Sequence, residues 1–351
     1  MKKVSTYILS LNDYIDKKCP ELFYFIPNYY NTTVFMIVKS LLRSNLLLLV
    51  FMWQSNSFKF GLGSLFNIGF DANSPVLKLF IGFVIRHLAD KKIPNPDQQQ
   101  DFLIKLLFLL QYKETLKKIE EHPIAKEKLL INLMNVFEQK HILLLSMNLL
   151  MLLKGDLYND EEMGIGSKYY QTQFIELCSK DEKLLEHFLN LLLNHINDLI
   201  TEVKLNYTES TNTSLPSRER HNNYSKACTG YTVLYKTVRA LELVASLIPF
   251  AFLEHNAVLT QRTSDLCMHI IREGTDGKLN KLLTELNSGD NKKIETIKMF
   301  LSPIAGIYLS LYQFLSKKRS ESTKIEEYII KADGFELELM KIFISELKST
   351  K

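Results

Sequence analysis

Two histidines and a Cys-x-His pair are the residues of this sequence whose types could bind a metal ion. His187 and His195 are eight residues apart in a stretch of helical periodicity. At about 1.5 Å per residue they lie roughly 12 Å apart, too far to share one ion. Cys267 and His269 flank Met268, and alternate residues of a helix point in different directions. We therefore expect no metal site and interpret Cys267 as a buried thiol beside a surface histidine.

Glycine-bearing and acidic motifs also lack the spacing of a catalytic site. The G-x-G pairs at 61–63 and 164–166 have no third glycine and no predicted strand before them, which argues against a dinucleotide-binding loop. The acids at 161–162 and 181–186 could form carboxylate pairs, but acids in a first helical turn more often complement the helix dipole. The sequence therefore nominates no catalytic residue and no cofactor.

The distribution of charge argues against a nucleic-acid partner, and the cysteines argue against a disulfide-linked or zinc-binding fold. Residues 1–60 hold seven Lys or Arg and three Asp or Glu, and the rest of the chain holds 36 of each sign, so the net charge of +4 lies near the N-terminus. This excess is too small for a nucleic-acid footprint. The four cysteines are far apart and form no C-x-x-C pair. We therefore expect neither a disulfide framework nor a zinc ribbon. The same cysteine pattern indicates a reducing compartment, and we expect the protein to be cytoplasmic.

The most apolar stretch, residues 34–53, raises the question of a membrane span. Lys39 and Arg43 interrupt it and leave 46–53 as the longest uninterrupted apolar piece, well short of the roughly 20 residues that a span requires. We expect a buried core helix and no stable membrane span. The alternative, a membrane-associated helical protein, predicts that the chain sediments with membranes at high salt.

Any functional residues must be positioned by helices, because apolar residues recur at steps of three and four and no alternating strand pattern is present. Residues 179–253 predict a helical hairpin. Ser179 and Glu182 have the spacing of a capping box at its start, and Pro249 ends its second arm. The segment 206–226 between the arms is rich in Ser, Thr and Asn and predicts a polar loop.

The rest of the chain predicts further helices around this hairpin. The expected helices span 32–53, 75–90, 98–112, 114–121, 124–138, 141–153, 255–273, 278–286, 291–301, 304–317 and 325–347, and one more leads into the hairpin. Paired helices without a fixed sequence period indicate an all-α fold, an irregular α-solenoid or armadillo-like stack of helix pairs. We expect one scaffold over 1–316 with loops at 155–168 and 206–226, a linker at 317–323 and a C-terminal helix at 324–351.

Local motifs keep a recognisable order along almost the whole chain. They are Leu22-Phe23 with Ile26-Pro27 and Tyr30; Phe83-Val84 with His87 and Asp90; Asn95-Pro96-Asp97; Gln111-Tyr112-Lys113-Glu114; Asp181-Glu182 with Phe188-Leu189-Asn190; Ile248-Pro249 with Ala251-Phe252-Leu253; and Leu301, Pro303 and Gly306-Ile307. This order resembles the helical region before the RING finger in the large SPRY–RING ubiquitin ligases of the Kip1-ubiquitination-promoting (KPC) type and their plant relatives. It resembles more distantly the helical core of ubiquitin-chain elongation factors.

The resemblance implies a RING-type E3 ubiquitin transferase, but it implies a scaffold rather than the catalytic module for this chain. A RING holds two zinc ions with about eight Cys and His ligands, whereas nothing after His269 is a cysteine or histidine. The SPRY module expected upstream is also missing. We therefore expect the chain to be inactive alone and to work through an E2, a substrate and a RING-bearing subunit, by holding partners at high effective concentration.

Polar residues at the expected turns are the candidates for a partner surface. They are Asn95, Asp97, Gln111, Tyr112 and Lys113, and the alternative interpretation is that they cap a helix and connect adjacent turns. The loops at 155–168 and 206–226 and the basic N-terminal helices are further candidate surfaces. A general helical-repeat adaptor unrelated to ubiquitin has the same predicted fold.

Overall fold

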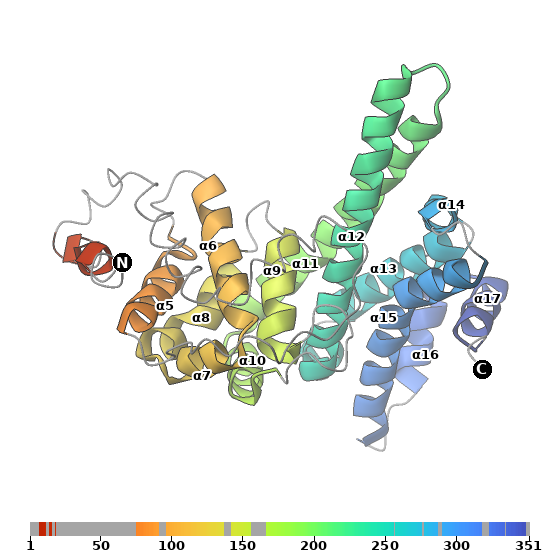
Figure 1. The fold of residues 1–351 in the computed structure, drawn as a ribbon. Helices are drawn as coiled ribbons and strands as arrows, with labels where there is room; N and C mark the ends of the chain where they lie inside the picture. The colour runs from red at the N-terminus through yellow and green to blue at the C-terminus, as the bar shows by residue number, and fades with distance from the viewer. Residues whose placement is uncertain are drawn as a thin grey trace. The chain divides into compact units, whose positions relative to one another are not determined.

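All regular elements in the described part of the chain are helices (Figure 1). The computed structural model describes residues 7–11, 14, 15, 18, 75–90, 96–136, 142–155, 166–255, 257–275, 277–286, 290–317, 323–333 and 335–348. The all-α prediction is confirmed. The predicted helix at 32–53 lies outside these residues. Among the helices that are described, none has the length and apolarity needed to span a membrane.

The packing divides the chain into two compact units, Met1–Val136 and Phe137–Lys351. This division differs from the single scaffold over 1–316 that the sequence suggested. The last two helices, α16 (Thr323–Ile330) and α17 (Leu337–Lys348), pack on helices α13 (Ala257–Thr275) and α15 (Asp290–Lys317). They are therefore part of the second unit and do not form the one separate helix expected at 324–351.

The first unit is built around α5. Its helices are α5 (Pro75–His87), α6 (Pro96–Leu110), α7 (Lys113–Glu121) and α8 (Pro123–Val136). α5 packs against α6 and α8, and it buries side chains almost all round, as expected for a helix covered on several sides. The Asn132 side chain on α8 donates a 2.7 Å hydrogen bond to the carbonyl of Ile85 on α5, which ties the two helices together.

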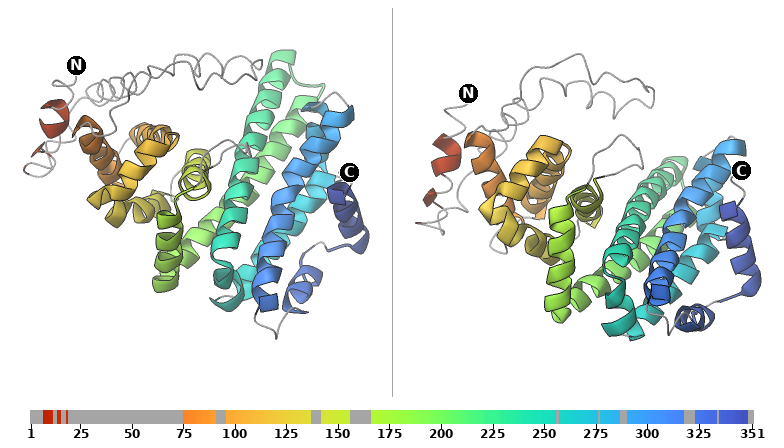
Figure 2. Two further views of the ribbon diagram at one scale, coloured as in Figure 1. Left: turned by 60° about the horizontal axis from the view of Figure 1, so that its bottom comes forward. Right: turned by 90° about the horizontal axis from the view of Figure 1, so that it is seen from below.

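A long antiparallel hairpin, α11 (Glu182–Thr211) with α12 (Ser217–Leu247), dominates the second unit (Figures 1 and 2). Its apolar stripes face each other and bury side chains such as Leu189, Ile196 and Leu241 completely. The second arm ends before Pro249, as predicted. The start differs, because Asp181 rather than Ser179 is the N-cap and accepts a hydrogen bond from the backbone N–H of Leu184.

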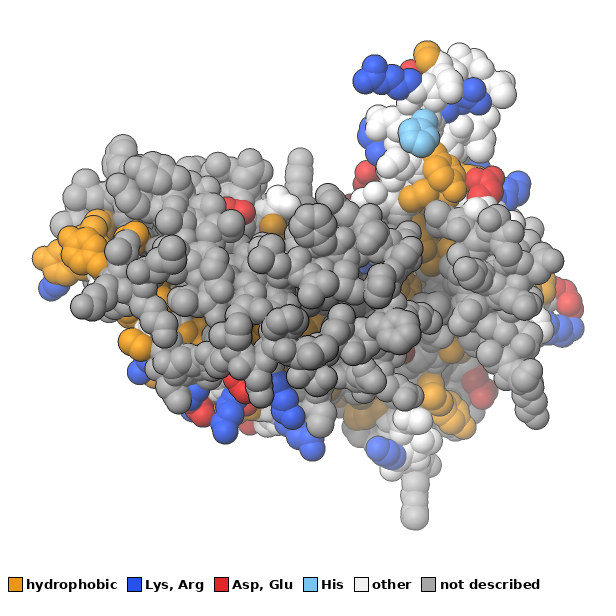
Figure 3. All heavy atoms as spheres, viewed as in Figure 1, with side chains coloured by type: hydrophobic (Ala, Val, Ile, Leu, Met, Phe, Trp, Pro, Cys, Tyr) orange, Lys and Arg blue, Asp and Glu red, His pale blue; other side chains and the backbone are white. Residues whose placement is uncertain are grey.

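The hairpin loop is much shorter than the predicted 206–226, because both helices continue into the polar segment and leave only 212–216 between them. Helical structure persists there since Tyr207 is buried and its hydroxyl donates a 2.7 Å hydrogen bond to Glu285 of α14 (Lys278–Leu286). In Figure 3 the outer end of the hairpin shows Lys and Arg side chains among white side-chain and backbone atoms, with a His and a few acidic and hydrophobic side chains. The polar composition of 206–226 therefore indicated a solvent-exposed surface correctly, but it predicted a loop where most of the segment is helical.

Smaller helices fill the rest of the second unit. In chain order they are α9 (Ile142–Leu149), the π-helical turn η2 (Leu150–Lys154), α10 (Lys168–Lys180) and η3 (Ala251–His255). Gly155 ends η2 in the left-handed conformation, with φ 76°, which glycine adopts without steric cost. α15 continues through Pro303, where the sequence suggested two helices; a proline removes a donor and bends a helix without always ending it.

Candidate functional site

A polar pocket of about 490 Å³ lies between α11 and α13 in the second unit. We call it the α11–α13 pocket. Its lining residues are Leu193, Asn194, Asn197, Lys204, Arg262, Asp265, Leu266, His269, Arg272, Glu273 and Asp333. This volume falls in the range of about 300–1,000 Å³ that is typical of ligand sites.

Helical spacing on α11 supplies one wall of the pocket. Asn190, Asn194, Asn197, Thr201 and Lys204 follow one another at steps of four and three, so they form one polar stripe along the helix. The apolar stripe of α11 packs against α12 and its other neighbours. The amphipathic pattern that folds the hairpin therefore also presents a row of amide side chains to the pocket.

The opposite wall comes from α13, which runs beside α11 in the same direction. Arg262, near the start of α13, donates hydrogen bonds from its two terminal nitrogens to the side-chain oxygens of Asn190 and Asn194, the second at 2.7 Å. Arg262 thus anchors one end of the pocket through two neutral amides. Asp265, one turn further on, accepts hydrogen bonds from Gln261 at 2.8 Å and from the backbone N–H of Asp333 at 2.9 Å.

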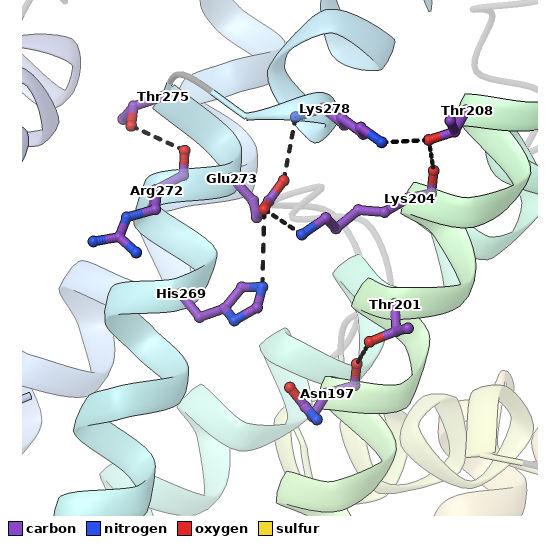
Figure 4. A network of polar contacts seen from close by, with 9 residues as sticks. All are labelled: Asn197, Thr201, Lys204, Thr208, His269, Arg272, Glu273, Thr275 and Lys278. Carbon is purple, nitrogen blue, oxygen red and sulfur yellow. Dashed lines mark hydrogen bonds and ion pairs between the residues drawn. The ribbon is translucent and has the colours of Figure 1, made fainter. Parts of the chain in front are cut away.

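A charged cluster around Glu273 closes the other end (Figure 4). The Lys204 ammonium lies 2.5 Å from the Glu273 carboxylate, and the backbone N–H of Lys278 donates to the other oxygen at 3.2 Å. His269 Nε2 lies 4.0 Å from the same carboxylate. The Lys278 ammonium also bonds Thr208 of α11 at 2.7 Å. These contacts connect α11, α13 and α14, so they hold the pocket walls together.

The electrostatic balance of this cluster favours neutral His269. Partial burial lowers the pKa of His269 below its ordinary value, and the nearby Lys204 ammonium lowers it further. Arg272 acts in the same direction, whereas Glu273 and Asp333 raise the pKa. Since the unfolded chain binds a proton more readily than the folded one, the His269 contribution to stability decreases as the pH falls through about 6.5.

We predict that Lys204→Met raises the pKa of His269 and that Glu273→Gln lowers it further, because each change removes one of two opposing charges. Titration of the histidine ring signals by NMR measures both shifts. Glu176→Gln is the control, since it removes a carboxylate paired with Lys180 on α10. A His269 pKa that does not move in the Lys204→Met protein would show that the ammonium does not act on the imidazole.

The pocket contains no activated nucleophile. Cys267, beside it on α13, is fully buried, and burial raises the pKa of its thiol to about 12, so the thiolate needed for nucleophilic chemistry or metal binding is scarce. Within the described ranges, no group of three or more His, Cys, Asp or Glu side chains is placed to hold a metal ion. The arrangement is suited to binding by hydrogen bonds.

The partner-surface residues predicted from sequence belong to the first unit, and none of them is among the residues that line the α11–α13 pocket. Asn95 lies outside the described residues, and Asp97 belongs to the first turn of α6. Gln111 and Lys113 are exposed at the turn between α6 and α7. Tyr112 is the N-cap of α7 and packs on Phe108, with ring centroids 5.4 Å apart. The role of these residues as a partner surface remains a prediction. Tyr112 stands at the N-cap position of α7, but its side chain makes no capping hydrogen bond.

Sequence reasoning missed the α11–α13 pocket. The asparagines at 190, 194 and 197 stand at helical spacing in the sequence, and this pattern was a usable signal. Their partner Arg262 is about 70 residues further on, with |i−j| of 72 and 68 for the two contacts. Only the packing of α11 beside α13 reveals that the two stripes face each other.

A known repeat family and a plant protein are similar to this chain. Residues 186–351 match the family model described as RNF123-like, TPR repeat. The chain is 26% identical over 250 residues to the E3 ubiquitin-protein ligase RKP of Arabidopsis thaliana, an alignment that covers 68% of this chain and 19% of RKP. The chain therefore spans about a fifth of the length of that relative. No solved structure matches significantly. These findings confirm the resemblance noted in the sequence: the chain is similar to the helical repeat region of KPC-like E3 ubiquitin ligases.

Proposed function

We propose that this chain is a non-catalytic helical scaffold of a KPC-like ubiquitin ligase, which positions a substrate or partner for ubiquitin transfer in the cytoplasm. The match of residues 186–351 to the RNF123-like repeat carries the proposal. A scaffold needs no reactive side chain, because it accelerates transfer by raising the effective concentration of its partners. The hydrogen-bonding chemistry of the α11–α13 pocket supports a binding role.

The expected partners are an E2, a substrate or a RING-bearing subunit. Immobilised chain 1–351 should recover such proteins from cell extract, identified by mass spectrometry, in excess over an unrelated helical-repeat protein of similar size. Recovery of other proteins without any component of the ubiquitin pathway would contradict the proposal and favour the alternative, a general helical-repeat adaptor.

Residues 1–351 alone are expected to form no ubiquitin chains. A RING requires about eight Cys and His ligands in two zinc sites, whereas the four cysteines of this chain form no C-x-x-C pair. Incubation with E1, a panel of E2s, ubiquitin and ATP, followed by immunoblotting, tests this expectation, with an intact RING ligase as the positive control. Robust autoubiquitination by the purified chain would contradict a non-catalytic scaffold.

A further inference from the structure

We propose that the α11–α13 pocket binds an acidic peptide segment in extended conformation. This inference rests on the proposed scaffold function and specifies the chemical class of its partner. It depends on which hydrogen-bonding groups of the pocket are already used by the protein and which remain available to a ligand.

The amide side chains of α11 are left as donors. Arg262 occupies the side-chain oxygens of Asn190 and Asn194, so their NH₂ groups are the parts that can serve a ligand. The side chain of Asn197 is exposed and makes no hydrogen bond within the described part of the protein. Amides spaced one helical turn apart, about 5.4 Å, can donate to alternate carbonyl groups of an extended peptide, which face one side and repeat about every 6.6 Å.

Two of the three acids that line the pocket already accept hydrogen bonds from the protein. Asp265 accepts from Gln261 and from a backbone N–H, both at one carboxylate oxygen, and Glu273 accepts from Lys204 and from the N–H of Lys278, one at each oxygen. Asp333, which is exposed, is the remaining acid in the lining. The available groups are therefore mainly donors, and a ligand rich in carboxylate and carbonyl oxygens complements them.

Arg262 is the expected contact for an acidic side chain. Its guanidinium has five N–H donors and uses two of them on neutral amide oxygens rather than on a carboxylate. The positive charge is thus held in place by the asparagines without being neutralised by them, and it can form a charge-assisted hydrogen bond with Asp or Glu of a partner. Leu193 and Leu266 add apolar contacts for side-chain methylenes.

The size of the pocket favours a short segment over a folded domain or a phosphate alone. A volume of about 490 Å³ accommodates a few residues of an extended chain. A phosphate group favours several converging cations, whereas Arg262 bonds neutral amides, Lys204 is paired with Glu273, and Arg272 is paired with Glu336. The geometry therefore favours carboxylates over phosphorylated residues.

Selection from a random dodecapeptide library on the full chain tests the proposal. We expect enrichment of Asp and Glu, and binding of the selected peptides, resynthesised and measured by fluorescence polarisation, that weakens as salt is raised. Arg262→Gln should weaken binding tenfold or more, because it removes a charge-assisted hydrogen bond. Asn197→Ala should weaken it several-fold without affecting folding, since its side chain has no protein partner in the described structure.

Arg218→Gln and Asn222→Ala are the matched controls, because they make the same changes at exposed positions of α12 outside the pocket lining. Both should leave the dissociation constant unchanged. Three results would overturn the proposal. They are selected peptides without acidic enrichment, tighter binding of a peptide with phosphoserine than of one with glutamate at the same position, and equal binding of the selected peptides to Arg262→Gln. If Arg262→Gln still recovers ubiquitin-pathway proteins from extract, only this inference fails; if acidic peptides bind but no such proteins are recovered, only the proposed function fails.

Discussion

Replacing Phe188 by alanine is expected to lower the free energy of unfolding of the second unit by about 3–5 kcal/mol. Phe188 is 0% exposed on α11, and its ring meets the Phe174 ring of α10 edge to face, with centroids 6.2 Å apart. The substitution removes that contact and leaves a cavity between two helices. Since natural domains are stable by only about 5–15 kcal/mol, this change removes a large share of the total.

Urea denaturation followed by circular dichroism measures this loss, and hydrogen exchange assigns it to α10 and α11, since two units of one chain need not unfold together. Phe188→Leu is the matched control and should cost much less, because it keeps most of the buried volume. His187→Ala, on the neighbouring exposed position of α11, should change stability little. Equal stability of Phe188→Ala and the wild type would contradict the buried position of the ring.

The sequence predicted most helices because their apolar spacing reflects one buried face. For Phe188, Leu192 and Ile196 the periodic pattern and the observed burial agree. The pattern failed where a distant contact decides the structure. Tyr207 lies in a polar stretch, yet its hydroxyl bonds Glu285, 78 residues away, and that contact supports helix where composition suggested a loop.

Function was harder to predict than fold, because the α11–α13 pocket depends on the alignment of two helices far apart in sequence. Asn194 and Arg262 become neighbours only through the packing around α13. Gly306 shows the same limit. It belongs to a family-like motif, and a Cβ there would overlap the Glu242 side chain of α12, so the glycine leaves room for that side chain beside α15.

Replacing Gly166 by alanine is expected to destabilise the junction between η2 and α10 by about 3 kcal/mol, at the upper end for overpacking. A Cβ at this position would overlap the carbonyl of Leu153 and the backbone of Lys154. Those atoms cannot easily move, because the Gln171 side chain bonds the Leu153 carbonyl at 2.5 Å. The backbone N–H of Gly166 also donates to the Lys154 carbonyl at 3.2 Å.

Gly166 and Gly155 are needed for different reasons. At Gly166 a Cβ would clash with backbone atoms, whereas at Gly155 the backbone has a positive φ. Gly155, which follows Lys154 in the chain, has φ 76°, and asparagine tolerates this region better than alanine. Gly155→Asn should therefore cost less than Gly155→Ala, whereas Gly166→Asn should cost at least as much as Gly166→Ala, because any Cβ meets the same backbone. Thermal unfolding of the four proteins tests this order. A Gly166→Ala protein as stable as the wild type would mean that η2 and α10 do not approach each other as closely as described.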